Sequence, residues 1–248
     1  MTDVTAALSV ALNNDLQELR AISQNLANVS TNGYKREVTY VTAFQRVLDE
    51  TALDQSVAGG GRIEGTAPEL GVVRDMQQGA FKYSGNAFEL ALQGGGFLSV
   101  ETAEGTRYTR KGEMKIDEQG RLALVSGQPV LGEGGEIFLR NSPFTIGSDG
   151  IVTQDGVALD RLSLSAFRDA RLLNYQGEGL YAAPTGGPAS PEPFKGKVMQ
   201  GFVETSNVKS ADEMIRLVEI TRHFETSHKV MSGYDGMLDK AINVLGDL

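Results

Sequence analysis

The chain has 248 residues, of which 40% are hydrophobic and 22% charged, a composition typical of a soluble globular protein with room for a sizeable core. Its formal net charge of -9, with no run rich in lysine or arginine, argues against nucleic-acid binding. The absence of cysteine excludes disulfides and cysteine-ligated zinc, and because apolar residues nowhere run together for about 18 positions, we expect no stable membrane insertion.

The N-terminal segment, 1–33, is predicted to be a helix. A stripe with alternating four- and three-residue spacing, apolar except for one aspartate, consists of Leu8, Leu12, Asp15, Leu19, Ile22, Leu26 and Val29. This spacing is typical of a coiled-coil seam, although an ordinary amphipathic helix packed on its own domain shows the same pattern over so few repeats. The first residues lack the basic region and long apolar stretch of a signal peptide, so we expect a cytosolic chain or one exported without a cleaved signal.

The predicted helix ends in an unusual polar stretch, SQNLANVSTNGYKRE at Ser23–Glu37. Asn32 and Gly33 offer the backbone a left-handed conformation that closes a helix. The side-chain amides of Asn25 and Asn28 each carry donors and an acceptor, so they can cap carbonyls of the same chain or bridge to a neighbouring subunit. Both interpretations remain open at the level of sequence.

The middle of the chain is predicted to be β-structure. All seven prolines lie between Pro68 and Pro193, where glycine is also concentrated, and this disfavours long helices. Asp149-Gly150 and Asp155-Gly156 lie between apolar runs and are hairpin signals. We predict an antiparallel β-rich domain, meander- or barrel-like, at 79–183, with an extended connector at 34–78 before it and a return linker at 184–209 after it.

The C-terminal segment, 210–248, is predicted to be a second helix, because Ser210 and Glu213 have the spacing of a capping box. One frame of three- and four-residue spacing, interrupted by Thr221, His228 and Asp235, contains Met214, Leu217, Phe224, Met231, Leu238, Ile242 and Leu245. Four apolar residues lie off this frame and are predicted to face solvent or other copies: Ile215, Val218, Ile220 and Val230.

These elements together predict an α+β fold. Isolated amphipathic helices are marginal in water, and most of their stability comes from packing an apolar face. We therefore predict that the two long terminal helices pair with each other as an α-helical coiled-coil domain, with the β-rich domain looped out between them.

The sequence contains no recognisable catalytic equipment. His223 and His228 are five residues apart on the predicted helix and do not share a face, so they cannot chelate one metal ion. No G-x-S-x-G, P-loop or H-E-x-x-H motif is present, and GGGF at Gly94–Phe97 is interpreted as a tight turn. We expect no catalytic, cofactor-binding or metal site and therefore no enzymatic function.

Three blocks of the sequence resemble the axial proteins of the flagellar rod and hook. The N-terminal block matches at Asn25, Leu26, Ala27, Asn28, Thr31, Gly33, Tyr34 and Lys35. The central block matches at Leu90, Gly96, Phe97, Tyr108, Thr109, Arg110, Gly112, Asp117, Gly120 and Leu122. The C-terminal block matches at Gly201, Glu204, Ser206, Asn207, Val208, Glu213, Met214, Arg222 and Phe224. The length and compact middle resemble the proximal rod members best, with the distal rod members next.

The resemblance implies a structural subunit of the bacterial flagellar basal-body rod. Such a subunit would polymerise through its terminal helices into the periplasm-spanning drive shaft that transmits motor torque. Its implied partners are other copies of itself, neighbouring rod proteins and the flagellar type III export apparatus, which passes subunits without a cleaved signal peptide. The implied location is the periplasmic rod of the basal body.

We predict an assembly interface from the helical stripes and the matching signatures. It comprises Leu8, Leu12, Leu19, Ile22, Asn25, Leu26, Asn28, Val29, Gly33, Tyr34, Asn207, Met214, Leu217, Phe224, Met231, Leu238 and Ile242. The alternatives are a distal rod or hook subunit of the same family, a periplasmic glycan-binding β-module, and a hydrolase whose carboxylate pair the sequence does not reveal.

Overall fold

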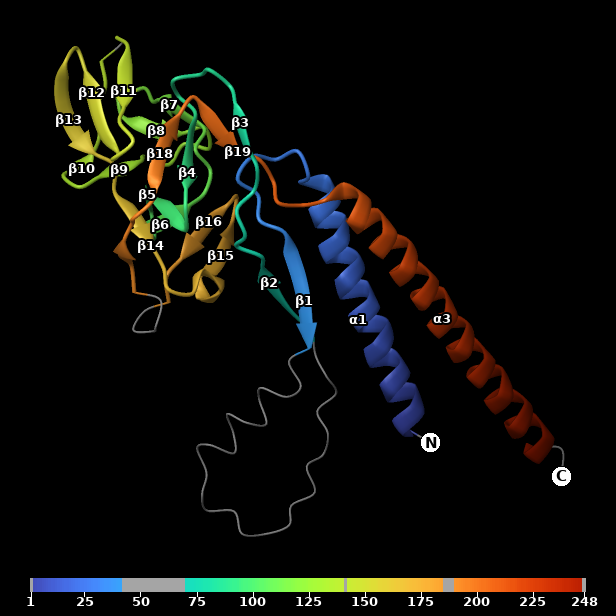
Figure 1. The fold of residues 1–248 in the computed structure, drawn as a ribbon. Coiled ribbons are helices and arrows are strands. Elements are labelled where there is room, and N and C mark those ends of the chain that lie inside the picture. The colour runs from blue at the N-terminus through green and yellow to red at the C-terminus, as the bar shows by residue number, and fades with distance from the viewer. Residues whose placement is uncertain (1, 42–69, 141, 185–189, 247–248) are drawn as a thin grey trace, which may run out of the picture. The chain divides into compact units, whose positions relative to one another are not determined.

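The computed structural model describes residues 2–41, 70–140, 142–184 and 190–246 (Figure 1). The chain divides into two compact units. The helical unit consists of Met1–Ala27, Glu37–Arg74 and Lys209–Leu248, and the β unit consists of Asn28–Arg36 and Asp75–Val208. Residues 42–69 of the predicted connector and residues 185–189 of the predicted return linker lie outside the described residues.

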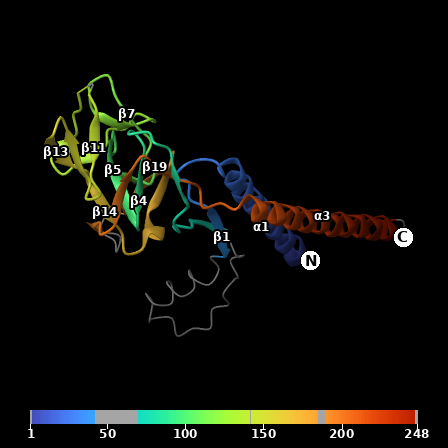
Figure 2. The same cartoon turned by 45° about the horizontal axis from the view of Figure 1, so that its top comes forward.

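The helical unit contains α1 (Thr2–Ala27) and α3 (Ser210–Gly246), which run antiparallel. They lie side by side near the end of α1 and the start of α3, and they separate toward the chain termini (Figures 1 and 2). Among the described residues, no helix is long and apolar enough to cross a membrane.

The predicted coiled-coil pair is wrong, because the two helices form no long apolar seam. The buried positions on α1 and α3 are as often polar as apolar, and all lie in the halves where the helices touch: Asp15, Ala21, Ile22, Asn25, Glu213, Ile220 and Ser227. Met214, predicted at the seam, is exposed, whereas Ile220, predicted off it, is buried. The side chains of Leu238 and Ile242 lie outside the described residues.

The physical reason for this difference is that α3 carries apolar residues on more than one face. Of the predicted frame, Leu217, Phe224 and Met231 are half-buried and Met214 is exposed, while Ile220, off the frame, is buried. Glu213, which is buried, and His223, whose side chain is 63% exposed, contact polar side chains of α1.

A two-stranded ribbon completes the described part of the helical unit. Strands β1 (Glu37–Val41) and β2 (Leu70–Arg74) pair antiparallel, with Val38 opposite Val73. Both strands contact α1, and Glu37 forms an ion pair with Arg74 across the ribbon. A two-stranded ribbon is marginal alone, so its packing on α1 stabilises it.

The β unit is built from short antiparallel pairings. Its largest sheet has six strands in the order β15-β16-β6-β5-β14-β17, and a three-stranded sheet has the order β11-β12-β13. The smaller pairings are β18 with β4, β19 with β3, β7 with β8 and β10 with β9. At the turn between β12 and β13, Asp155 and Gly156 both have positive φ, as a two-residue hairpin of this type requires.

The bounds of these strands are as follows: β3 (Phe81–Tyr83), β4 (Leu90–Gln93), β5 (Gly96–Thr102), β6 (Gly105–Thr109), β7 (Met114–Ile116), β8 (Leu122–Leu124), β9 (Leu131–Gly132), β10 (Gly135–Glu136), β11 (Phe144–Ile146), β12 (Ile151–Gln154), β13 (Val157–Arg161), β14 (Leu164–Ala166), β15 (Asn174–Gly177), β16 (Leu180–Ala182), β17 (Glu192–Pro193), β18 (Lys197–Gln200) and β19 (Phe202–Glu204). A short 3-10 helix spans Ala170–Leu172. Residues 192–204, assigned from the sequence to the return linker, thus form strands that pair back onto the β unit.

Two hydrophobic clusters fill the β unit, and β5 separates them. Successive side chains of a strand point to opposite faces, so Leu98 and Val100 enter one cluster and Phe97 the other. The larger cluster is mainly aliphatic, includes the ring of Phe144, and also contains buried residues of β4, β7, β8, β11, β12 and β18. The smaller one is mainly aromatic, with Phe97, Phe167 and Tyr181 in edge-to-face contact.

Candidate functional site

A buried cluster of three charged side chains joins the three blocks recognised in the sequence. Lys35 comes from the N-terminal block, Arg110 follows β6, and Glu204 ends β19; their side chains are 1%, 3% and 2% exposed. Nζ of Lys35 lies 2.6 Å from Oε1 of Glu204, and Nη1 of Arg110 lies 3.4 Å from Oε2. Lys35 also donates to the carbonyl of Gln77 at 2.7 Å, and the Glu204 carboxylate accepts from the Gly79 amide at 2.9 Å.

The electrostatics of the cluster depend on Glu204. Burial lowers the pKa of Lys35 and that of Arg110, and the Glu204 carboxylate opposes both shifts. The Arg110 guanidinium also lies 5.0 Å from the centre of the Phe97 ring, which attracts the cation. Its Nε is buried without a hydrogen-bond partner among the described residues. Glu204 is therefore the carboxylate shared by both buried cations, and Asp75 also opposes the lowering of the Lys35 pKa.

Gly33 brings the backbone of the same three blocks together. Its amide donates to the carbonyl of Glu204 at 2.7 Å, and its φ is +69°, in the left-handed region. A Cβ at this position would lie 2.9 Å from the carbonyl oxygen of Arg110. Both the conformation and the close approach favour glycine here.

Replacing Gly33 with alanine is expected to destabilise the β unit by at least about 1–2 kcal/mol, the usual cost of a left-handed residue that carries a Cβ. The approach to Arg110 adds a steric cost, because the neighbouring atoms are backbone. Gly156→Ala is the matched control, since its φ of +78° is similar but no atom lies within 4 Å of the added Cβ. Urea unfolding monitored by near-UV circular dichroism measures the free energy of unfolding of both variants. Equal losses of stability in the two variants would show that Arg110 contributes no steric constraint.

Asn207 links three segments of the β unit through its amide. Its Oδ1 accepts from the Arg36 amide at 2.7 Å, and its Nδ2 donates to the carbonyls of Asp75 at 2.8 Å and Gln77 at 3.1 Å. Backbone N–H and C=O groups that are not paired within a sheet need other hydrogen-bond partners, and a side chain can supply them where distant segments meet. The structure therefore gives Asn207 a set of partners within its own chain.

Asn25 has the equivalent role in the helical unit. Its Nδ2 donates to the Glu37 carbonyl at 2.9 Å and to Oε2 of Glu213 at 3.2 Å, and its Oδ1 accepts from the Glu37 amide at 2.7 Å. The side chain is buried, and it ties α1 to β1 and to the first turn of α3. Asn28, by contrast, accepts from the hydroxyl of Thr31 at 3.2 Å, a local contact at the end of the helix.

The structure distributes the predicted interface residues over several environments. Buried among them are Ile22, Asn25, Gly33 and Tyr34. Half-buried are Leu8, Leu12, Leu19, Leu26, Asn28, Val29, Asn207, Leu217, Phe224 and Met231. Met214 alone of the described members is exposed, and a role for these residues between subunits stays a prediction.

Lys35, Arg110 and Glu204 were matched to the family blocks but were absent from the predicted site. Sequence spacing gives no signal for their meeting, because Lys35 and Glu204 are 169 positions apart. Their presence in separate signature blocks was the one available indication. The described residues contain no group of three or more His, Asp or Glu side chains arranged to hold a metal ion.

Comparison with known proteins gives two family matches and relatives that span the chain. Residues 91–154 match the family described as flagellar hook protein FlgE/F/G D1 domain, which includes Arg110. Residues 199–244 match the family described as flagellar basal body rod FlgEFG protein C-terminal, which includes Glu204, Asn207 and Glu213. The matches thus cover two of the three blocks that meet at the charge cluster.

Full-length relatives carry the same family name. The flagellar basal-body rod protein FlgF of Caulobacter vibrioides is 32% identical over 98% of each chain. FlgF of Rhizobium meliloti is 32% identical over 96% of this chain and 97% of its own, and FlgG of Buchnera aphidicola subsp. Schizaphis graminum is 30% identical over 90% and 92%. The resemblance expected from the sequence blocks is confirmed, and the chain belongs to the flagellar basal-body rod protein family.

Proposed function

We propose that this chain is a structural subunit of the flagellar basal-body rod, of the kind named FlgF, and that it assembles with other rod components through its terminal helices. Its relatives FlgF and FlgG carry the name of that structure. The polar groups of the charge cluster and of Asn25 and Asn207 are engaged within the chain, so they serve its architecture. We infer no catalytic role.

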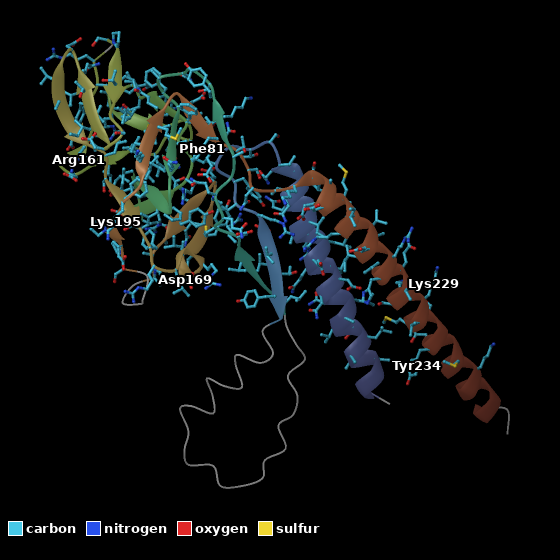
Figure 3. The ribbon with its side chains drawn as sticks, viewed as in Figure 1. Phe81, Arg161, Asp169, Lys195, Lys229 and Tyr234 are labelled. Atoms are coloured by element: carbon cyan, nitrogen blue, oxygen red, sulfur yellow. The ribbon has the colours of Figure 1, made fainter. Side chains whose placement is uncertain are left out.

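The outer face of α3 supports assembly through the helices. Five large apolar side chains of this helix are between 52% and 64% exposed: Met214, Ile215, Val218, Val230 and Met237. Ile215 and Val218 lie almost opposite Ile220, which packs inward, and the other three lie on its flanks. Lys229 also points away from α1, whereas Tyr234 lies on the side facing it (Figure 3). A helix that is apolar on two faces is typically buried on both, and an exposed apolar patch marks an interaction surface.

Repeated contact between such a face and a different surface of the next copy generates an open helical assembly. We infer that this assembly is the torque-transmitting shaft in the periplasm. We also infer that subunits reach it through the flagellar type III export apparatus, as the resemblance to the rod and hook proteins implies. Ile215 and Val218 are the first candidates for the subunit contact, because they are exposed and lie on adjacent turns.

The double substitution Ile215→Glu/Val218→Glu tests the proposal. We expect incorporation into purified basal bodies to fall at least about tenfold, the effect of about 1.4 kcal/mol lost per contact, and swimming to be lost. Because both side chains are exposed, the unfolding free energy of the isolated protein should change by no more than about 0.5 kcal/mol per site.

The matched control is Thr221→Glu, which places the same side chain at an exposed polar position of α3. It should leave incorporation unchanged. Normal incorporation and swimming of the double variant would contradict assembly through this face.

A further inference from the structure

Two of the polar contacts between described residues of α1 and α3 are here called rungs. In the first rung, Nδ1 of His223 lies 2.9 and 2.8 Å from the two carboxylate oxygens of Asp15. In the second, Nδ2 of Asn25 donates to Oε2 of Glu213 at 3.2 Å. Asp15, Asn25 and Glu213 are all buried. The His223 side chain is 63% exposed, so the first rung lies at the edge of the helix contact and the second lies in its interior.

The spacing of the rungs corresponds to one antiparallel alignment. Asp15 and Asn25 are ten positions apart on α1, and Glu213 and His223 are ten positions apart on α3 in the opposite direction. Both rungs can form together only when the helices are aligned in this register.

Slippage of α3 along α1 by one heptad would break both rungs at once. If α3 slips so that Asn25 still faces a residue of α3, Asp15 would face Val230 and Asn25 would face Ile220. Asp15 would lose its contact with His223, and Asn25 would lose its contact with Glu213 while keeping its hydrogen bonds to Glu37. A buried carboxylate that loses its partner is costly. A buried polar group at a helix interface is known to specify register in this way.

We propose that the Asp15–His223 and Asn25–Glu213 rungs are specificity determinants that fix the register of α1 against α3, and thereby determine which face of α3 is turned outward. The first part concerns the isolated chain alone. The second part, that the outward face is the one offered to other subunits, rests on the proposed function. His223 also explains why an aspartate interrupts the apolar stripe of α1.

The register can be measured by disulfide trapping, because the natural sequence contains no cysteine. Ala11→Cys with Ser227→Cys reports the native alignment, since these positions continue the spacing of the rungs and both substitutions keep side-chain size. Ala11→Cys with Tyr234→Cys reports the alignment slipped by one heptad. Each pair is oxidised in the full chain at low concentration, and the monomeric product is quantified by mass spectrometry.

With the rungs intact, we expect the native pair to form and the slipped pair to remain at background. Asp15→Leu/His223→Leu, which removes the first rung without leaving an unpaired charge, should raise the slipped product at least about tenfold. The reciprocal exchange Asp15→His/His223→Asp restores the pair and should return both products to their original yields. These measurements use the isolated chain, so their failure is distinguishable from a failure of the assembly experiment above.

An unchanged product ratio in Asp15→Leu/His223→Leu would overturn the inference. So would a rise of the slipped product in the reciprocal exchange as well as in the leucine variant, since the rung would then not be the cause. If the leucine variant forms neither product, the reciprocal exchange tests the inference. Crosslinking of the native cysteine pair at the original yield in that variant supports the role of the first rung, and loss of this crosslink overturns the inference.

Discussion

Replacing Glu204 with alanine is expected to destabilise the β unit by about 3–5 kcal/mol, the usual cost of removing one partner from a buried ion pair. The substitution removes the carboxylate that pairs with both the buried ammonium of Lys35 and the buried guanidinium of Arg110. It also removes the acceptor of the Gly79 amide. Urea unfolding of the purified protein, followed by near-UV circular dichroism, measures the change in free energy of unfolding.

Glu104→Ala is the control for this prediction. Glu104 also pairs with an arginine, Arg107, at 2.9 Å, but its side chain is 76% exposed. An exposed ion pair contributes no more than about 1 kcal/mol, so the control should lose far less stability. Similar losses in the two variants would contradict the role assigned to burial.

A triple substitution separates charge from packing. Changing Lys35, Arg110 and Glu204 together to methionine removes the charges while filling much of the same volume. Buried ion clusters replaced by apolar residues of similar size often lose little stability. We therefore expect the triple variant to be more stable than Glu204→Ala, and a triple variant that is less stable would indicate that the cations themselves contribute.

Phe97→Ala is expected to cost about 3–5 kcal/mol, as is typical of truncating a buried phenylalanine. The ring is buried at the centre of the aromatic cluster, with centroid distances of 5.6 Å to Phe167 and 5.7 Å to Tyr181. Its loss leaves a cavity and removes the aromatic face beside Arg110. Urea unfolding followed by near-UV circular dichroism measures the change in free energy of unfolding.

Phe138→Ala serves as the matched control, because that ring is 59% exposed. It should change the free energy of unfolding by no more than about 0.5 kcal/mol. Phe97→Leu should lie between the two alanine variants, since leucine retains apolar volume but not the ring face that attracts the guanidinium. Equal stability of Phe97→Ala and Phe138→Ala would contradict the packing described here.

Local signals in the sequence predicted local structure well. The Ser210 and Glu213 spacing placed the start of a helix at Ser210, where α3 begins. The Asp155-Gly156 pair predicted a hairpin, and both residues adopt the positive φ that it requires. The turn signal succeeds because its physical cause lies within the two residues that form the hairpin, whereas the Glu213 carboxylate of the predicted capping box contacts Asn25 of α1.

The residue contacts between the two helices, and those within the charge cluster, could not be predicted in the same way. Apolar periodicity identified both helices and the half-buried Leu217, Phe224 and Met231 of α3. It did not distinguish Ile220, which is buried, from Ile215, which is exposed, because the two are equally hydrophobic. The deciding contacts come from Asp15 and Asn25, whose partners lie about 200 positions away. The cluster of Lys35, Arg110 and Glu204 likewise depends on topology that no local pattern specifies.

The pairing of Lys35 with Glu204 has a consequence for the order of folding. The segment that carries Lys35 belongs to the β unit, yet its counter-ion is 169 positions further along the chain. A polypeptide that emerges N-terminus first exposes this lysine long before the glutamate is available. Distant contacts form slowly because the intervening chain must first be ordered, so completion of the β unit is a late event that awaits nearly the whole polypeptide.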